Sequence, residues 1–340
     1  MILGNYEIIS IYPNFANKGG AQDIALCLAK KMNKDQLPII LTETPFQEIE
    51  KEYRIGDVIF EKFSIKNILR YADNETVFIS HHRKNTSLLV LLKHILGKKL
   101  LIIHVAHNIF TNLKLFSLFP ENVIAVSSAV KENLIQYFKL SPRNVKVIYN
   151  GLEDSGENRN VVRNDGIVKI LLPGRICNVK RQIEIVKKTR GKLLEHINIY
   201  FAGVGSDADK LKLEIGVLKQ YHYLGYINIK ETLNQYDYVC LFSQKEGFPL
   251  SLIEGCMFGK PLITNNIPSV LDINDNGQTG FVFSDFESFV EGCNNLPLPN
   301  SNEYIRLSMN ARMKYKEKFT EDRMISEYKQ VVEFSIKNRY

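Results

Sequence analysis

The stretch Tyr238-Val-Cys-Leu-Phe-Ser-Gln-Lys-Glu-Gly-Phe-Pro-Leu-Ser-Leu-Ile-Glu-Gly-Cys-Met-Phe258 combines three kinds of local structure in one run. Residues 238–242 are strand formers, residues 243–249 have the composition of a turn, and residues 250–258 have helical character. Glu246 lies in the turn and Glu254 in the helix. Open α/β sheets bind ligands in the crevice at the carboxyl ends of their parallel strands. The stretch therefore predicts a strand–turn–helix unit, and its two carboxylates mark the best place in the chain to look for chemistry.

Strand-like and helix-like runs alternate along the whole chain, which predicts an α/β fold built on parallel sheets. We expect strands at 6–12, 37–42, 57–60, 76–80, 100–105, 122–126, 145–149, 168–172, 197–202, 221–224, 238–242 and 261–264. We expect helices at 20–32, 87–96, 128–138, 182–189, 208–218, 250–258 and 301–337. Residues 151–166 are poor in apolar side chains and have the composition of a linker. These patterns predict two doubly wound domains facing each other across a cleft.

The bulk composition is that of a globular protein with room for two cores. The chain has 340 residues, of which 45% are hydrophobic and 24% are charged. No secretory signal is expected, and lysines interrupt the most apolar region, 88–105, so that it does not predict a transmembrane helix. The five cysteines form no paired motif, which favours reduced thiols in a cytoplasmic protein.

Positive charge is concentrated in the N-terminal half. Residues 1–150 hold 19 Lys and Arg against 13 Asp and Glu, whereas the whole chain has a net charge of +7. This excess indicates either an anionic partner, such as a membrane surface, or ordinary solvation. Lys93, Lys98 and Lys99 stand beside an apolar helical run and favour peripheral contact with an anionic membrane. No basic stripe is interleaved with aromatic residues, so nucleic acid is not an expected partner.

Glycine turns follow two of the expected strands. Gly19 and Gly20 precede a helix, where backbone N–H groups and the helix dipole favour an anion, although a tight turn alone explains such a pair equally well. A third glycine at the spacing of a dinucleotide fingerprint is missing. Gly205 lies in a second turn of this kind, followed by Asp207 and Asp209, which the helix dipole explains without a metal.

Two cations follow the first strand of the second half. Arg175 offers a planar guanidinium and Lys180 a point charge, a combination that suits a diphosphate. The alternative is a surface loop with two solvated charges. Histidines also end strands: His104 and His107 point to opposite faces if both lie in the strand, so at most one faces the cleft, and His107 is the better candidate. His81, His82, Arg83 and Lys84 either contact an anionic acceptor or lie in a solvated loop, and the solvated loop is the expected outcome.

Taken together, these residues resemble a retaining glycosyltransferase of the large family 4 type with the two-domain GT-B fold. The matching pieces occur in family order over nearly the whole chain, most densely between residues 168 and 283. They are Gly19-Gly20-Ala21, His107-Asn108, Val126-Ser127, Val147-Ile-Tyr-Asn-Gly151, Gly174-Arg175 with Lys180, Gly203-Val-Gly205, Leu224-Gly225-Tyr226, Glu246-Gly-Phe-Pro with Glu254, Gly259-Lys-Pro-Leu-Ile-Thr264 and Asn276-Gly277-Gln-Thr-Gly280. The chain departs from the family at Gly255-Cys-Met-Phe258, where small residues are more common, and at Gln22, where an acid is common.

The resemblance implies an N-terminal acceptor-side domain, 1–155, and a C-terminal domain for the nucleotide sugar, 156–317, with a final helix at about 318–340 that packs back on the first domain. It implies that Arg175 and Lys180 neutralise the leaving diphosphate, and that Glu246 and His107 contact the donor sugar. The remaining donor contacts that it implies are Gly19, Gly20, Gly205, Tyr226, Ile227, Phe248, Pro249, Leu250 and Glu254. No metal or other cofactor is implied, because the two cations supply the positive charge.

The function expected from this resemblance is transfer of a hexose or N-acetylhexosamine from a nucleotide diphosphate sugar, with uridine favoured by prevalence. The expected acceptor is a saccharide or a lipid-linked saccharide in bacterial surface polysaccharide or lipopolysaccharide assembly. Two other hypotheses remain. A sugar-nucleotide epimerase of similar fold needs acid/base carboxylates, and a catalytically silent binding subunit has no need of Arg175, Lys180, Glu246 and Glu254 together.

Overall fold

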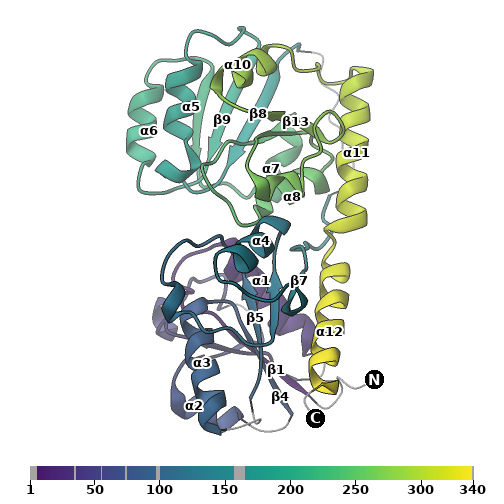
Figure 1. Ribbon diagram of the computed structural model, residues 1–340. Helices are drawn as coiled ribbons and strands as arrows, with labels where there is room; N and C mark the ends of the chain where they lie inside the picture. Colours follow the sequence, from purple (N-terminus) through teal and green to yellow (C-terminus); the bar gives the residue numbers. More distant parts are fainter. Residues whose placement is uncertain are drawn as a thin grey trace. The chain divides into compact units, whose positions relative to one another are not determined.

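The computed structural model describes residues 6–33, 36–54, 56–72, 75–96, 100–156 and 165–338. The chain forms two compact units (Figure 1). Unit 1 contains residues 1–150 and 322–340, and unit 2 contains residues 151–321. The sequence predicted domains of 1–155 and 156–317, with the helix from about 318 assigned to the first domain.

Among the described residues, unit 1 is built on a seven-stranded sheet in the order β3-β2-β1-β4-β5-β6-β7, with every pairing parallel. Its strands are β1 (Glu7–Ile11), β2 (Ile39–Thr42), β3 (Ile59–Lys62), β4 (Thr76–Ser80), β5 (Leu101–Ala106), β6 (Asn122–Ala125) and β7 (Val145–Val147). Its helices are α1 (Gly20–Met32), α2 (Ile65–Tyr71), α3 (Arg83–Leu96), α4 (Ser128–Gln136) and α12 (Glu321–Lys337), with short 3₁₀ turns η2 (Phe46–Glu48), η4 (Lys114–Phe116) and η5 (Pro142–Asn144).

The described residues of unit 2 form a six-stranded parallel sheet in the order β10-β9-β8-β11-β12-β13. Its strands are β8 (Val168–Pro173), β9 (Ile197–Ala202), β10 (Tyr221–Gly225), β11 (Tyr238–Leu241), β12 (Leu262–Asn265) and β13 (Gly280–Phe283). Its helices are α5 (Gln182–Thr189), α6 (Ala208–Ile215), α7 (Ile229–Thr232), α8 (Leu250–Met257), α9 (Pro268–Leu271), α10 (Phe286–Asn294) and α11 (Asn302–Lys318), with 3₁₀ turns η6 (Asn178–Lys180) and η7 (Leu233–Gln235).

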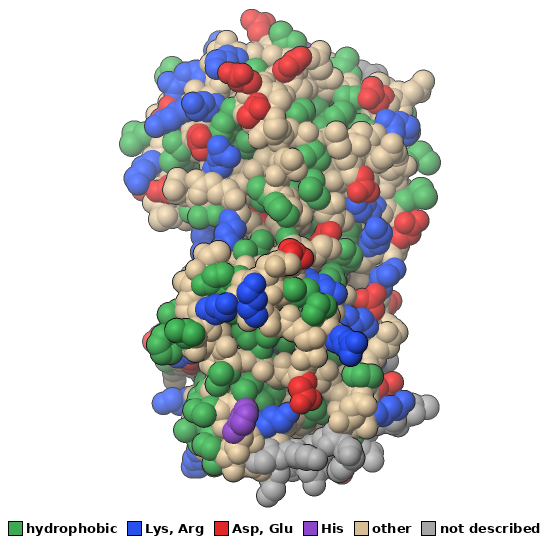
Figure 2. Space-filling view, in the orientation of Figure 1, with side chains coloured by type: hydrophobic (Ala, Val, Ile, Leu, Met, Phe, Trp, Pro, Cys, Tyr) green, Lys and Arg blue, Asp and Glu red, His purple; other side chains and the backbone are tan. Residues whose placement is uncertain are grey.

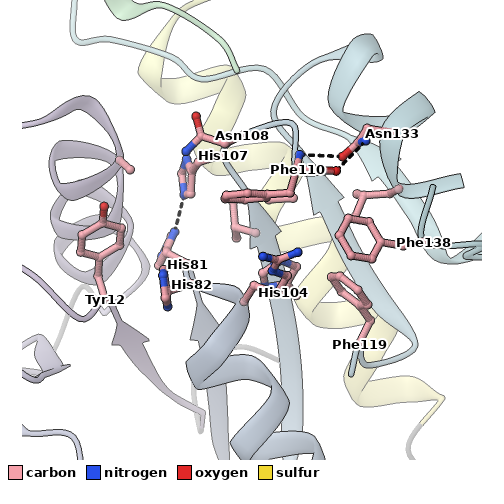
Figure 3. A pocket seen from close by; sticks show the side chains of 15 residues that line it. Tyr12, His81, His82, His104, His107, Asn108, Phe110, Phe119, Asn133 and Phe138 are labelled. Atoms are coloured by element: carbon pink, nitrogen blue, oxygen red, sulfur yellow. Dashed lines mark hydrogen bonds between the residues drawn. The ribbon is translucent and has the colours of Figure 1, made fainter. Parts of the chain in front are cut away.

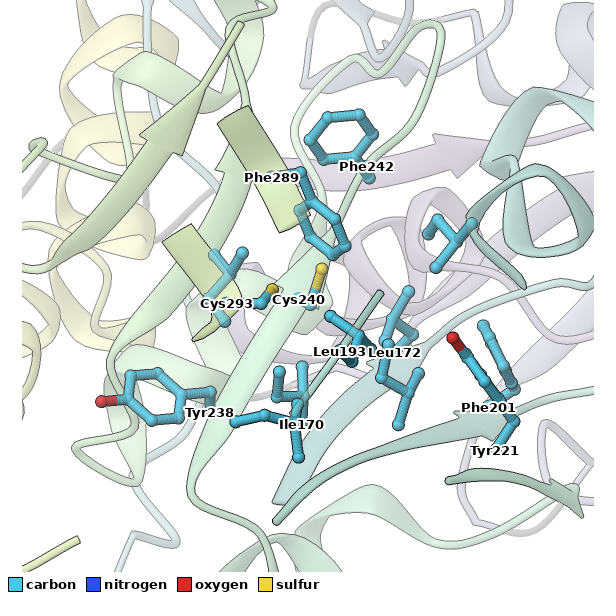
Figure 4. Packing of buried hydrophobic residues seen from close by; sticks show 14 of the residues in the cluster. Ile170, Leu172, Leu193, Phe201, Tyr221, Tyr238, Cys240, Phe242, Phe289 and Cys293 are labelled. Atoms are coloured by element: carbon cyan, nitrogen blue, oxygen red, sulfur yellow. The ribbon is translucent and has the colours of Figure 1, made fainter. Parts of the chain in front are cut away.

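The central strands are apolar on both sides because helices cover both faces of each sheet. Every residue of β4, β5 and β11 is buried. In unit 2 the strand side chains meet those of α5, α6 and α10 in one core that includes Phe201, Phe242 and Phe289 (Figure 4). Burial of this apolar surface makes the largest favourable contribution to the free energy of packing the sheet against its helices.

The strand order reverses once in each sheet. In unit 1 the reversal lies between β1 and β4, and in unit 2 it lies between β8 and β11. Loops leaving such a pair of neighbouring strands diverge to opposite faces and open a crevice at the carboxyl ends, where doubly wound sheets bind their ligands. The two α/β doubly wound domains predicted from the sequence are therefore confirmed, and in each the topology marks the strand reversal as the expected position of a ligand-binding crevice.

The C-terminal tail differs from the single helical run predicted over 301–337. Helix α11 ends at Lys318 and α12 begins at Glu321, with buried Phe319 between them. The backbone N–H of Leu152 donates to the Phe319 carbonyl at 3.0 Å, and that of Glu321 donates to the Leu152 carbonyl at 2.9 Å. A distant segment thus takes the backbone groups that would have continued the helix.

Candidate functional site

The loops at the crevice of unit 2 bring Lys180 and Glu246 together. Lys180 ends η6, in the loop after β8, and Glu246 lies in the loop after β11. The Lys180 Nζ and Glu246 Oε1 atoms are 2.7 Å apart, and the two side chains are only 21% and 12% exposed. The Gln244 backbone N–H donates to the Val179 carbonyl at 2.8 Å and ties the two loops together. A charge pair therefore spans the point where the strand order reverses.

Arg175 lies in the same loop as Lys180 and is exposed. Its backbone carbonyl accepts a hydrogen bond from Gln182 Nε2 at 3.0 Å, which fixes the loop that carries it. Within the described residues, its guanidinium has no ion-pair partner. Arg181, which the sequence analysis passed over, has a different role: it makes a two-pronged ion pair with Glu184, at 2.7 and 3.0 Å. Arg175 is thus the guanidinium at this crevice that stays available to an anion.

Two glycines in the loop after β9 allow a close backbone approach to the loop after β8. Gly203 has φ +143°, and a Cβ atom there would lie 2.1 Å from the Gly174 carbonyl oxygen. A Cβ atom on Gly205 would lie 2.2 Å from the carbonyl oxygen of Ile176. The Ile176 N–H donates to the Val204 carbonyl at 3.0 Å between the two loops. Packing of the crevice wall therefore requires Gly205, the predicted donor-binding glycine.

The helix after β11 carries the second predicted carboxylate. Helix α8 begins at Leu250, directly after Phe248 and Pro249, which are both buried. Glu254 lies on the helix and is partly buried, although its neighbours Ile253 and Gly255 are fully covered. A Cβ atom on Gly255 would lie 2.8 Å from a Leu262 side-chain carbon, so α8 packs closely on the sheet.

The last predicted donor contacts in unit 2 lie at the same edge of the sheet. Tyr226 and Ile227 directly follow β10, and the Tyr226 side chain is 60% exposed. Asn265, at the end of β12, was missed by the sequence analysis. Its Nδ2 donates to the Ser243 carbonyl at 2.7 Å and supports the loop that leads to Glu246. Its position at the end of a buried strand was the signal that could have identified it.

Unit 2 also has a cavity whose charged lining residues have a structural role. It has a volume of about 540 Å³ and is lined by Asp154, Ser155, Gly156, Lys230, Asn234, Phe258 and Arg312. The Arg312 guanidinium donates to both Asp154 oxygens, at 2.8 and 2.7 Å, and to the Met257 carbonyl. The contacts of Arg312 with Asp154 and Met257 thus hold the chain before residue 157 against α8 and α11.

Unit 1 contains a histidine-lined pocket of about 50 Å³ at the carboxyl ends of β4 and β5 (Figure 3). His81, His82, His104 and His107 all line it, together with Tyr12 and Ala21 beside β1 and the aromatic residues Phe110, Phe119 and Phe138. Strand β5 ends at Ala106, so His107 has left the strand. This turn explains why both His104 and His107 reach the pocket, where a continued strand would have allowed only one.

The prediction that His81 lies in a solvated loop is wrong. Its side chain is only 4% exposed, because the chain turns into α3 directly after β4. Its Nδ1 atom lies 2.9 Å from the Nε2 atom of His107. Burial lowers the pKa of His107 to about 4 and that of His104 to about 3, and it holds the pKa of His81 well below its usual range. All three imidazoles are therefore neutral at physiological pH.

The glycine pair of unit 1 lies at the start of α1, with Gly20 as its first residue. The Gly19 backbone N–H donates to the Tyr53 hydroxyl at 3.1 Å, and that hydroxyl donates to Asp23 at 2.7 Å. The Gly19 N–H that was predicted to face the donor is thus already engaged within the protein. The sequence did not reveal this, because Tyr53 comes from a distant turn.

Two further findings concern the described part of the chain alone. No cluster of three or more His, Cys, Asp or Glu side chains there has the arrangement of a metal site. No helix there is both long enough and apolar enough to cross a membrane.

Comparison with known proteins agrees with this geometry. The family model of glycosyl transferases group 1 matches residues 158–314, and that of glycosyltransferase family 4 matches residues 21–155. The capsular polysaccharide biosynthesis glycosyltransferase CapH of Staphylococcus aureus is 30% identical to this chain over 47% of its residues. The match spans only 47% of the length of CapH. The O-antigen biosynthesis glycosyltransferase WclY of Escherichia coli is 23% identical over 92% of this chain and 94% of its own.

Among solved structures, Anabaena HepE in complex with UDP and glucose superimposes with a TM-score of 0.81 at 16% identity, over 96% of this chain and 99% of that one. The two Rossmann-like units, with their crevices at the strand reversals, have the GT-B architecture. Two family models of glycosyltransferases thus match the two halves of the chain in succession, the second half to group 1 and the first half to family 4.

Proposed function

We propose that the chain is a retaining glycosyltransferase that moves a hexose or N-acetylhexosamine from a UDP-sugar to a saccharide or lipid-linked saccharide acceptor. The observation that carries this proposal is the Lys180–Glu246 pair at the strand reversal of unit 2. A cation and a carboxylate side by side suit the two parts of such a donor, the diphosphate that leaves and the sugar that becomes positively charged.

In this proposal, unit 2 binds the nucleotide sugar. Arg175 and Lys180 neutralise the charge that builds on the diphosphate as the glycosidic bond breaks, which is usually the largest contribution to catalysis of this kind. Glu254 accepts hydrogen bonds from the ribose hydroxyls, and Tyr226 and Ile227 border the base. Phe248, Pro249, Leu250 and Gly205 border the diphosphate and the sugar. No metal ion is needed, because the two side chains supply the positive charge.

The chemical step in this proposal uses Glu246 as an electrostatic partner of the oxocarbenium-like sugar. The acceptor oxygen attacks on the face from which the phosphate departs, and the leaving phosphate oxygen takes the acceptor proton. Glu246 forms no covalent bond, in contrast with the nucleophile of retaining glycosidases. Unit 1 contributes His107 and the N-terminus of α1 at Gly20, whereas the Gly19 N–H already donates to Tyr53, and unit 1 binds the acceptor.

The relatives support the class of substrate. CapH and WclY are named for capsular polysaccharide and O-antigen biosynthesis, and HepE was solved with UDP and glucose. We infer that this chain acts in bacterial surface polysaccharide or lipopolysaccharide assembly, in the cytoplasm and at the inner face of the membrane.

A thermal-shift screen with nucleotide sugars tests the donor. We expect UDP-sugars to raise the melting temperature. At a donor concentration one hundred times the Kd, binding adds about 2.7 kcal/mol to the free energy of unfolding. GDP- and ADP-sugars serve as controls, and EDTA should leave the shift unchanged. A shift with GDP- or ADP-sugars alone would contradict the choice of uridine, and a shift that disappears with EDTA would contradict the metal-free site. With the donor identified, the NMR coupling of the product's anomeric proton shows whether configuration is retained.

The proposed membrane contact is supported by an exposed apolar patch on unit 1. Leu115 and Phe116 in η4 are 91% and 78% exposed, and Leu91 and Ile95 lie exposed on α3. Ser87 of α3 connects the helix to η4, because its hydroxyl donates to the Phe116 carbonyl. Leu91 and Ile95 lie on the same face of α3 as Ser87, one and two turns further along.

The segment that carries this patch has charges of one sign. Between residues 76 and 120 the chain has six Lys and Arg and no Asp or Glu. On the face drawn in Figure 2, Lys and Arg side chains are more frequent than acidic ones over unit 1. Lys93 lies in α3, whereas Lys98 and Lys99 fall outside the described residues. Exposed apolar side chains on a segment whose charges are all positive suit an anionic lipid surface.

Liposome flotation tests this contact. We expect recovery with anionic vesicles to exceed recovery with neutral ones and to fall as salt is raised. Changing Leu115 and Phe116 to serine should reduce recovery, whereas Val217→Ser, at a 97% exposed position of unit 2, should not. Equal recovery with both lipids at every salt concentration would contradict the proposed membrane contact.

A further inference from the structure

The two histidines at the ends of β4 and β5 form a direct pair. The Nδ1 atom of His81 and the Nε2 atom of His107 are 2.9 Å apart, with the rings inclined by 28° (Figure 3). Strands β4 and β5 are neighbours in the sheet, so the two residues leave it side by side. At this distance one nitrogen must carry a proton and donate it while the other accepts. The pair therefore has two arrangements, which differ in the tautomer of both rings.

The second nitrogen of His81 distinguishes these arrangements. His81 Nε2 is buried and has no hydrogen-bond partner among the described residues. If His107 donated from Nε2, a neutral His81 would have to carry its own proton on Nε2, as a buried N–H with no acceptor. Orphaned buried N–H groups are rare in native structures, and buried acceptors that lack a partner are somewhat less rare. The arrangement with His81 Nδ1–H as the donor leaves only an acceptor unpaired.

Both rings are neutral, as this comparison requires. Burial holds the pKa of His81 well below its usual range and lowers that of His107 to about 4. Each neutral imidazole then carries one proton, and a proton on Nδ1 of His107 leaves Nε2 free to accept from His81. The Nδ1 atom of His107 is the ring nitrogen that takes no part in the His81 contact, and His107 lines the pocket.

We propose that His81 is a positioning residue that fixes His107 as the Nδ1–H tautomer, so that His107 presents a hydrogen-bond donor to its ligand. The tautomer of His107 is inferred from the geometry alone. Only the identity of the ligand, the donor sugar, depends on the proposed function. In this state His107 donates to a sugar hydroxyl oxygen. Its one basic nitrogen is occupied by His81, so His107 takes no proton from the acceptor, and the leaving phosphate remains the base.

Nitrogen NMR of the unliganded full chain, labelled with ¹⁵N-histidine, tests the tautomers directly. The chain has seven histidines, and His81→Asn and His107→Asn variants assign the two signals. At neutral pH we expect both His81 and His107 to carry the proton on Nδ1. A proton on Nε2 of His107 overturns the proposal. No sugar donor is present, so this result is independent of whether the chain transfers sugar.

Variants of His81 separate positioning from mere packing. His81→Phe removes the donor but fills the space, and we expect about a tenfold fall in kcat/KM for the donor, the size of one hydrogen bond. His81→Asn, whose amide N–H can take the place of Nδ1–H, should restore most of it. His94→Phe, on the exposed face of α3, is the matched control. Unchanged kcat/KM and an unchanged His107 tautomer in His81→Phe would overturn the positioning role. Expected tautomers in a chain that transfers no sugar would count against the proposed function instead.

Discussion

Replacing Glu246 by alanine should lower turnover by about 10² or more, because the proposed transition state loses the carboxylate that faces its positive sugar. The carboxylate is 12% exposed and 2.7 Å from Lys180 Nζ. In such a shielded position a charge interaction is stronger than in water. Initial rates of sugar transfer at saturating donor measure the effect.

The isosteric variant Glu246→Gln identifies the charge as the cause. It keeps the shape and the hydrogen-bonding oxygen, and it should lose most of the same activity. Glu184→Ala is the control, because this carboxylate pairs with Arg181 outside the proposed site. Near-native transfer by both Glu246 variants would defeat the assignment. Glu246 and Lys180 are in contact, so their effects should not add, and a double-mutant cycle measures the coupling.

Arg175→Ala should impair turnover and donor binding together, with kcat/KM falling by about 10². The guanidinium is exposed and has no ion-pair partner in the described part of the chain, so its removal leaves no buried charge unpaired. The loss should therefore appear in kinetics and in donor affinity, while the melting temperature of the unliganded protein stays the same. Calorimetric titration with UDP separates the binding effect from the catalytic one.

Arg190→Ala is the matched control for Arg175→Ala. Arg190 is an exposed arginine of the same unit that pairs with Glu214, and surface pairs of this kind contribute little to stability. Equal donor affinity in Arg175→Ala and in the unchanged protein would remove Arg175 from the diphosphate site.

Local patterns predicted the framework of the site well. The stretch 238–258 was expected as strand, turn and helix, and the structure has β11 at Tyr238–Leu241 and α8 at Leu250–Met257. Its apolar strand and apolar helix face are set by neighbours in the sequence, which is why pattern reasoning succeeds there. The family resemblance also assigned Lys180 and Glu246 to one donor, and the structure brings these two side chains to within 2.7 Å of each other.

Features that depend on distant segments could not be predicted. The apolar positions of 301–337 were assigned to one helical run in spite of their wider spacing between Tyr315 and Met324, and the break at Phe319 coincides with backbone bonds to Leu152. His81 looked solvated beside Arg83 and Lys84, yet the chain entering α3 buries it. The Gly19 N–H looked available, and a hydroxyl from Tyr53 occupies it. In each case the local sequence is compatible with either outcome, and only the tertiary packing selects one.

The placement of α12 has a consequence for synthesis of the chain. Unit 1 needs this helix, whose buried side chains include Met324, Tyr328 and Val332, yet α12 follows unit 2 in the sequence. The ribosome therefore completes unit 2 before it supplies the last part of unit 1. Domains generally fold as units while they emerge, so unit 2 can reach its native state first. The first 150 residues therefore remain without α12, and with the apolar surface that it covers exposed, until the end of the chain is synthesised.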